Sequence, residues 1–274
     1  RGCPRNCLYC TYPLIEGRRH RTSDPVAVRR AVEQYVGDGI RDFEFVDNVF
    51  NDPADHALRI CRELVGIEAP VRFRTTDLSP RGLTVELLEA MRAAGFVGVG
   101  LTVDSASDRV LRGLGKDVCA EDLSRAAEVI HRSDMPCLWI YLLGGPGETT
   151  STVRETLDFA ERNLRGEDAA IFFVGIRIFP GTGIERVARE QGVLSFDGNG
   201  FLDPVFYVSP DVSRGWMNYE VKRRAREVPG FIAPESQTVP LIPVGYRVAE
   251  WLELRRPVWR HTATARRLLS YFGL

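Results

Sequence analysis

The chain lacks any apolar run long enough to span a membrane, and no charged-then-apolar signal stretch begins it. It also lacks an excess of charge, since 36 basic residues are balanced by 37 acidic ones. Lysine is nearly absent, with Lys116 and Lys222 the only two. A balanced charge creates no overall field that would attract nucleic acid or an anionic membrane. These absences predict a soluble, cytoplasmic protein with no nucleic-acid partner and no transmembrane segment.

A fourth clustered cysteine is missing as well. The opening decapeptide carries three cysteines at the spacing C-x3-C-x2-C, namely Cys3, Cys7 and Cys10. Ferredoxin-type clusters and structural zinc sites use four protein ligands, whereas three thiolates can hold three irons of a 4Fe-4S cube. The fourth iron is then open to bind and activate a small molecule, which favours a catalytic cluster over an electron carrier. The other cysteines have no C-x2-C partner and are expected to be reduced and buried: Cys61, Cys119 and Cys137.

Two other interpretations of this loop stay open. His20 could complete a zinc site in an interaction domain, although the arginines beside it would oppose a dication. The loop could also hold a cluster in a non-catalytic electron-transfer module. Visible absorption after anaerobic purification tests the zinc hypothesis, because a zinc protein is colourless.

Beyond the cysteine loop, helix signals alternate with short β-branched or aromatic runs, which indicates parallel β/α units of an α/β fold. The length of 274 residues and 44% hydrophobic content are sufficient for one large domain. Strands are expected at residues 43–46, 71–75, 97–103, 138–143 and 171–176. Such a sheet curls into a full or partial barrel, whose active site lies at the carboxyl ends of the strands.

The alternation is lost from about Ser195. We therefore expect a barrel domain at residues 1–194 and a C-terminal extension at residues 195–274 that ends in a basic amphipathic helix. Such a helix can lie on a membrane, but it more often packs on its own domain with its arginines solvated. Aromatic residues of the extension could line a substrate pocket or pack in the core: Phe206, Tyr207, Trp216 and Tyr219.

The cysteine loop resembles that of the radical S-adenosylmethionine (radical SAM) superfamily, whose signature has this spacing and an aromatic residue before the last cysteine. Tyr9 occupies the aromatic position and, by the resemblance, would pack near the adenine. The resemblance implies that Cys3, Cys7 and Cys10 ligate a 4Fe-4S cluster whose open iron binds S-adenosylmethionine. Reductive cleavage would give a 5′-deoxyadenosyl radical that abstracts hydrogen from the substrate. An external one-electron donor, of flavodoxin or ferredoxin type, would supply the electron.

Two strand ends extend the resemblance. Asp47 and Asn48 follow the first expected strand, where family members often carry Gly-Gly-Glu, and either could accept a hydrogen bond from the methionyl amino group. Thr102, Asp104 and Ser105 end the third expected strand in a stretch similar to the family's Glu-Ser-Gly-Ser-Asp-x-Val-Leu. They would face the ribose or the methionine carboxylate. The alternatives are a turn at the first site and helix capping at the second.

The next two strand ends also match the family. Gly144 and Gly145 belong to a Gly-Gly-Pro-Gly-Glu-Thr turn, in which glycines let the backbone approach a flat ligand such as adenine. Phe179 lies in a stretch similar to the sixth strand's end, where backbone groups flank the adenine. Arg177 could reach the cofactor carboxylate or form a salt bridge at the barrel rim.

The resemblance covers about residues 1–194 and implies a partial (β/α)6 TIM-like barrel with a helical C-terminal extension. Because the family's first strand precedes the cysteine loop, that strand is missing here, and we expect a fragment. The combined motifs most resemble the group with a cobalamin-binding domain upstream, so any cobalamin would bind there and outside this chain. The expected reaction is cobalamin-dependent methyl transfer or a related modification of a small molecule or lipid. Methylthiotransferase and oxidoreductase chemistry are the alternatives.

Overall fold

The computed structural model describes residues 1–194, 203–233, 251, 254 and 256–271, and every structural statement refers to these residues. At its centre is a six-stranded sheet whose neighbouring strands are all parallel. In sheet order the strands are β1 (Asp42–Phe45), β2 (Arg72–Leu78), β3 (Phe96–Asp104), β4 (Cys137–Leu143), β5 (Ala169–Val174) and β8 (Phe231–Ile232).

Helices alternate with these strands along the chain. One helix, α2 (Pro25–Gly37), directly precedes β1. The helices between β1 and β5 are α3 (Ala54–Leu64), α4 (Val85–Ala94), α5 (Asp108–Gly113), α6 (Ala120–Arg132) and α7 (Thr150–Asn163). The flanking elements are α1 (Tyr12–Ile15), α8 (Gly183–Glu190), α9 (Arg214–Glu227), η2 (Val258–His261) and α11 (Thr262–Tyr271), with a small antiparallel pair of β6 (Ile176–Arg177) and β7 (Phe206–Tyr207).

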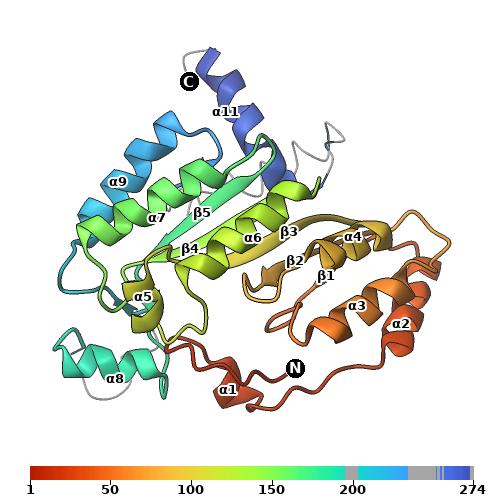
Figure 1. Ribbon diagram of the computed structural model, residues 1–274, viewed down its shortest axis with the longest axis horizontal. Helices are drawn as coiled ribbons and strands as arrows, with labels where there is room; N and C mark the ends of the chain where they lie inside the picture. The colour runs from red at the N-terminus through yellow and green to blue at the C-terminus, as the bar shows by residue number, and fades with distance from the viewer. Residues whose placement is uncertain (195–202, 234–250, 252–253, 255, 272–274) are drawn as a thin grey trace.

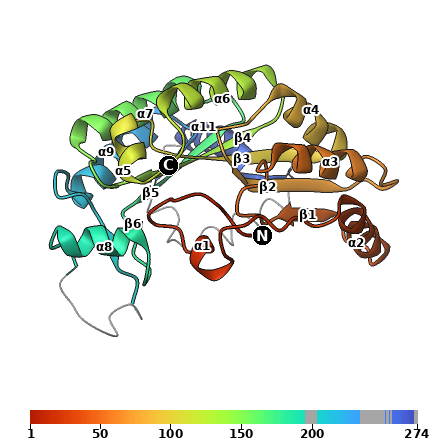
Figure 2. The same cartoon turned by 60° about the horizontal axis from the view of Figure 1, so that its bottom comes forward.

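The sheet curves, and helices cover its outer face (Figures 1 and 2). α3, α4, α6 and α7 lie on the outer face, whereas the N-terminal segment with α1 lies across the underside (Figures 1 and 2). All five predicted strands are present, so the predicted α/β fold with a partial parallel barrel is confirmed.

Local sequence signals account for the helix ends. The Asp24 side chain accepts the Val26 N–H ahead of Pro25, the first residue of α2, so cap and proline act together there. α4 begins after Thr84, whose hydroxyl accepts the Leu87 N–H at 3.2 Å, and ends at Gly95 with φ 99°. Glycine adopts this left-handed conformation without steric cost.

The main core lies between the sheet and the outer helices. Alternate residues of the central strands point into it and are fully buried, among them Leu101, Trp139 and Phe172. Near β1, the rings of Phe45 and Phe96 stack at 5.6 Å within a larger group of phenylalanines. Burial of this apolar surface supplies the main stabilisation of the fold and makes the sheet a firm support for the residues at its strand ends.

Segments beyond residue 194 complete the sheet. β8 pairs with β5 through Ala170 and Ile171, and α9 packs against α7 and β5. Arg266 of α11 donates to the Ala225 carbonyl of α9 at 2.7 Å, so this basic helix packs on its own domain. No described helix is both long and apolar enough to cross a membrane.

The aromatic residues predicted to line a pocket or the core have different environments. Tyr207 is buried, Trp216 packs against the main core, and Phe206 and Tyr219 are exposed. η2 lies against β4, and a side chain at Gly98 of β3 would collide with Pro257 and Trp259. The C-terminal segment therefore packs against the amino-terminal part of β3.

Candidate active site

The cysteine loop is held at both sides by backbone hydrogen bonds. Leu8 donates its N–H to Leu114, after α5, at 2.9 Å, and its carbonyl accepts the Ile184 N–H of α8 at the same distance. At the start of the loop, Gly2 has φ 79°, and a Cβ there would lie 2.1 Å from the Arg19 carbonyl oxygen. The loop is therefore a defined part of the fold rather than a loose terminus.

The three thiols of the loop lie close enough to influence one another electrostatically. Burial raises the pKa of the Cys7 thiol to about 11 and also raises the pKa of Cys10, while Cys3 is buried. Each cysteine of a 4Fe-4S cluster binds a different iron, so the thiols need not converge on one point. Indeed, no three His, Cys, Asp or Glu side chains in the described part of the chain are arranged to hold a single metal ion.

Asp104, at the end of β3, lies directly against this loop. Its side chain accepts the Tyr9 hydroxyl at 2.6 Å and pairs with the Lys116 ammonium at 2.8 Å, both through Oδ2. Asp104 is 2% exposed, and its φ of 63° makes it the one non-glycine residue with positive φ in the described ranges. Backbone strain of this kind is concentrated at functional sites.

The neighbours of Asp104 behave differently from one another. Ser105 is fully buried, and its hydroxyl lies 3.1 Å from that of Thr156 in α7 and accepts the Ser107 N–H. Ser105 thus joins the end of β3 to α7. Thr102, two residues before Asp104, is only partly buried. Ser107, the residue before α5, makes no side-chain capping hydrogen bond, so the Ser105 hydroxyl closes a local turn rather than capping the helix.

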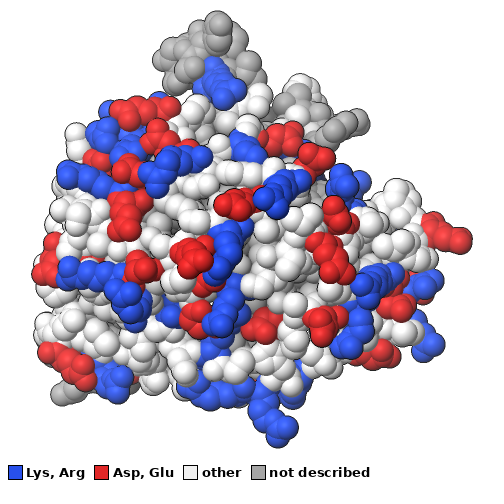
Figure 3. Space-filling model, viewed as in Figure 1, with Lys and Arg blue, Asp and Glu red and all other residues white. Residues whose placement is uncertain are grey.

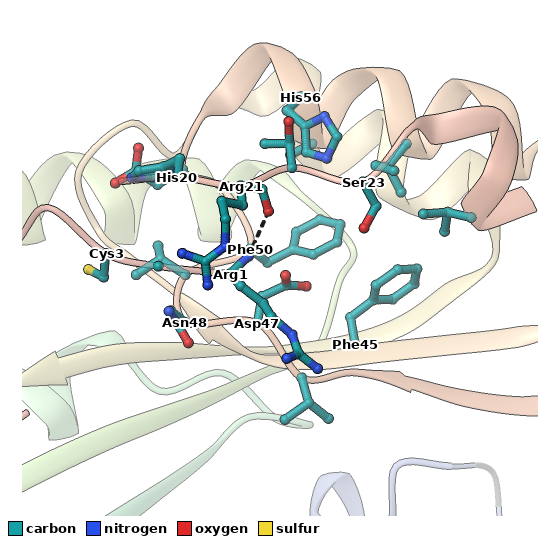
Figure 4. Close-up of a pocket in the computed structure, with 18 residues that line it drawn as sticks. Arg1, Cys3, His20, Arg21, Ser23, Phe45, Asp47, Asn48, Phe50 and His56 are labelled. Carbon is teal, nitrogen blue, oxygen red and sulfur yellow. Dashed lines mark hydrogen bonds between the residues drawn. The ribbon is translucent and has the colours of Figure 1, made fainter. Parts of the chain in front are cut away.

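At the end of β1, Asp47 and Asn48 line a cavity of about 260 Å³ together with Cys3. Figure 4 shows the Asp47 carboxylate pointing into this cavity, with Asn48 and Cys3 toward one end. The Asn48 amide donates to the Glu16 carboxylate at 3.0 Å, and that carboxylate also accepts the Gly2 N–H at 3.1 Å. Glu16, which sequence analysis did not identify, thereby connects the predicted β1 site to the start of the cysteine loop.

The glycine turn after β4 is closed by hydrogen bonds to a buried carboxylate. Gly144 has φ 97° and donates its N–H to the Glu148 carboxylate at 3.0 Å. Glu148 is fully buried, burial raises its pKa, and it also accepts the Thr152 hydroxyl at 2.5 Å. A Cβ at Gly145 would lie 3.0 Å from Leu114, the residue that anchors the cysteine loop. The motif therefore packs against the segment that carries the loop.

Arg177 and Phe179 lie beyond β5 and contact each other, with the guanidinium 4.7 Å from the ring centroid. Farther along, Gly181 and Gly183 line a second cavity of about 200 Å³ together with Cys7 and Cys10. Of the residues predicted to bind the cofactor, Asp104 bonds directly to the loop through Tyr9, and Asn48 is joined to the start of the loop through Glu16.

Two further titratable residues lie near this region without having been predicted. Burial, helped by the carboxylates of Asp47 and Glu44, raises the pKa of Asp77 at the end of β2 to about 6. Lys116 is the other, and its one visible signal was its identity as one of two lysines in the chain. Their positions could not be predicted because each depends on residues far away in sequence.

Comparison with known proteins supplies independent information. Residues 1–160, more than half of the chain, match the model of the Radical SAM superfamily. The chain is 28% identical over 202 residues to an uncharacterized methyltransferase of Pyrococcus horikoshii, covering 71% of this chain and 42% of that protein. It is also 28% identical over 207 residues to tryptophan 2-C-methyltransferase of Streptomyces laurentii, covering 69% and 34%.

A methylthiotransferase is among the similar proteins too. A tRNA-2-methylthio-N(6)-dimethylallyladenosine synthase of Mycolicibacterium paratuberculosis is 30% identical over 237 residues, covering 73% of this chain and 44% of that protein. The chain therefore spans less than half the length of these curated relatives.

Solved structures share the fold at low sequence identity. The radical S-adenosylmethionine methyltransferase TsrM from Kitasatospora setae, with cobalamin and a [4Fe-4S] cluster bound, superposes with a TM-score of 0.80 at 21% identity, over 98% of this chain and 59% of that one. The cobalamin-dependent enzyme OxsB has a TM-score of 0.63 at 14% identity, over 97% and 45%. These similarities concern the fold.

Proposed function

The chain belongs to the radical SAM superfamily, and from this premise we propose that it is the part of a radical enzyme that binds a 4Fe-4S cluster and S-adenosylmethionine. The observation that carries the proposal is the anchored loop of Cys3, Cys7 and Cys10, which lies against the carboxyl end of β3. When bound, the cluster supplies the electron that cleaves S-adenosylmethionine to a 5′-deoxyadenosyl radical.

The donor set of the loop fits this group. Three thiols are available, and each can bind a different iron of the cluster. Lys116 supplies a buried positive charge that favours the thiolate form of Cys7, which ligation requires. An open coordination position is thus left for the cofactor.

We assign the cofactor contacts by their position around the loop. Both Asp104 bonds use Oδ2, so Oδ1 would accept from a ribose hydroxyl. Thr102 lies two residues earlier on β3. Asp47 and Asn48 would receive the methionyl amino group beside Cys3. Ser105 would act by supporting the strand end, because its hydroxyl is engaged with Thr156.

The remaining contacts would come from the last two strand ends. The backbone of Gly144 and Gly145 and the segment of Phe179 would flank the adenine, and Arg177 would face the methionine carboxylate. The φ of 97° at Gly144 and the buried Glu148 hold the turn in one conformation, so the ligand would meet a preformed surface.

The reaction we favour is a cobalamin-dependent methyl transfer to a small molecule. The support is the two relatives named as methyltransferases and the fold shared with TsrM and OxsB. Cobalamin would bind outside this chain. A methylthiotransferase function is the second candidate, supported by the similar synthase that covers 73% of the chain.

An external one-electron donor would approach the loop from the side of α1. Leu14 and Ile15 of α1 are 56% and 76% exposed, and Arg18, Arg19 and Arg21 follow as exposed residues. Figure 3 shows basic side chains gathered along the lower edge of the molecule, where α1 lies in Figure 1. An apolar centre with a basic rim suits a small acidic electron-carrier protein of flavodoxin or ferredoxin type.

The test is electron paramagnetic resonance of the anaerobically reconstituted, reduced protein with and without S-adenosylmethionine. We expect a reduced 4Fe-4S signal that changes when S-adenosylmethionine is added, because the open iron is its binding position. Cys7→Ala should abolish the signal, whereas Cys119→Ser, outside the loop and at the start of α6, should retain it. A cluster indifferent to S-adenosylmethionine would favour the electron-transfer alternative, and a full signal in Cys7→Ala would contradict the ligand assignment.

A further inference from the structure

A buried ion pair lies directly under the cysteine loop. The side chains of Lys116 and Asp104 are 9% and 3% exposed, their charged atoms are 2.8 Å apart, and Tyr9 of the loop donates its hydroxyl to the same carboxylate oxygen. Removing two charges from water is costly, so a pair at this depth contributes little net stability. Its position calls for another explanation.

The backbone brings Lys116 to the loop. Leu114 accepts the Leu8 N–H at 2.9 Å, and a Cβ at Gly115 would lie 2.7 Å from the Asn6 carbonyl oxygen. The segment that carries Lys116 is therefore in contact with the residues on either side of Cys7. Glycine at position 115, with φ 68°, makes this close approach possible.

The two charges of the pair are held at the loop by geometry. The Asp104 carboxylate is bonded to Tyr9, which lies between Cys7 and Cys10, and it holds the Lys116 ammonium 2.8 Å away. Removal of either charge would leave the other uncompensated beside the loop. Burial lowers the pKa of Lys116, but the charges of Asp104 and Cys7 and the hydrogen bond to Asp104 together raise it above its ordinary value, so the ammonium stays charged.

We propose that Lys116 sets the reduction potential of the cluster bound by the three cysteines, by keeping one positive charge beside it inside the protein. This inference rests on the proposed function. Asp104 and Tyr9 are positioning residues for that charge. Reduction of the cluster adds one negative charge, which a nearby buried cation stabilises. At an effective dielectric constant of about 20, such a charge shifts the balance of reduced to oxidised cluster by about tenfold or more.

The choice of residue agrees with this role. Every other basic residue of the chain except Lys222 is arginine, yet a lysine occupies this buried position. An ammonium is a compact point charge, whereas a guanidinium spreads its charge and needs space for five donors. Asp104 lies at the end of β3 with a φ of 63°, and its bonds to Tyr9 and Lys116 hold the ammonium there.

The experiment is a potentiometric titration of the reconstituted protein, followed by electron paramagnetic resonance, without added S-adenosylmethionine. Lys116→Met should lower the midpoint potential by about 59 mV, which for one electron corresponds to a tenfold change in the ratio of reduced to oxidised cluster. Asp104→Asn should raise the potential, because it removes the opposing negative charge while its amide oxygen can still accept from Tyr9 and Lys116. Lys116→Arg keeps the positive charge, so its potential should lie closer to that of the wild type than the potential of Lys116→Met does.

Shifts of the midpoint potential in opposite directions for Lys116→Met and Asp104→Asn would show an electrostatic effect, because general disruption of the site would not depend on the sign of the charge removed. A shift of both variants in the same direction, or equal potentials in all proteins, would overturn the inference while leaving the proposed function intact. A wild-type protein that binds no cluster would overturn both. Should Lys116→Met alone fail to hold a cluster, the double variant Lys116→Met/Asp104→Asn keeps the site neutral, and its potential must lie below that of Asp104→Asn.

Discussion

Replacement of Asp77 by asparagine should raise the free energy of unfolding at neutral and higher pH and leave it unchanged at acidic pH. Asp77 ends β2, where burial and the carboxylates of Asp47 and Glu44 raise its pKa from 3.8 to about 6. A carboxyl group whose pKa is raised on folding binds its proton more tightly in the native state. It therefore lowers stability as pH rises from about 4 to about 6, and the loss then stays constant.

The magnitude follows from the size of the shift. About two pKa units correspond to roughly 3 kcal/mol, and solvent screening of this partly buried group reduces the effect to about 1–2 kcal/mol. Asp77→Asn removes the ionisation and keeps the size of the side chain. We expect the variant to be more stable by about 1–2 kcal/mol at pH 8 and unchanged near pH 4.

Urea unfolding of the metal-free protein at several pH values measures this difference. Asp38→Asn, at an exposed carboxylate after α2, is the matched control and should show no pH-dependent gain. A gain of equal size at every pH, or destabilisation at pH 8, would refute the reasoning, because it would mean that the Asp77 carboxylate makes favourable native contacts. A stability gain accompanied by weaker binding of S-adenosylmethionine would indicate that Asp77 is retained for function.

Three further predictions concern the loop, its surface and the sheet. Gly2→Ala should lower the iron content of the reconstituted protein several-fold, as measured by iron and sulfide analysis, because the new Cβ would lie 2.1 Å from a backbone oxygen. Gly39→Ala, also at positive φ but with open space around it, is the control and should leave the iron content unchanged. Arg19→Glu should slow reduction of the cluster by an acidic carrier protein several-fold at low salt and weaken the dependence of this rate on salt, as measured by stopped-flow absorption. Arg132→Glu, at an exposed position of α6, is the control and should leave the rate unchanged. Asp168→Ala should destabilise the protein by about 2–3 kcal/mol in urea unfolding, since its 1% exposed carboxylate accepts backbone and indole hydrogen bonds from β4; a loss below 0.5 kcal/mol would contradict this.

The family and the fold could be predicted from local patterns. The spacing of Cys3, Cys7 and Cys10 lies within ten residues, and the resemblance built on it is confirmed by the family match over residues 1–160. Strands such as β4 are recognisable because a continuous apolar run is characteristic of a strand buried on both faces. These features can be recognised in the sequence because each depends only on residues that are close together along the chain.

The electrostatic environment of the site depends on the tertiary structure. Tyr9 and Asp104 are 95 residues apart in sequence, and Glu16 meets Asn48 across 32 residues, so neither pairing has a local signature. The same holds for β8, a two-residue strand whose place in the sheet depends on the free edge of β5. The sequence by itself determined the family and the strands β1 to β5. Only the packing of distant strand ends decided which charges surround the cysteine loop, because burial and charge proximity are properties of the assembled fold.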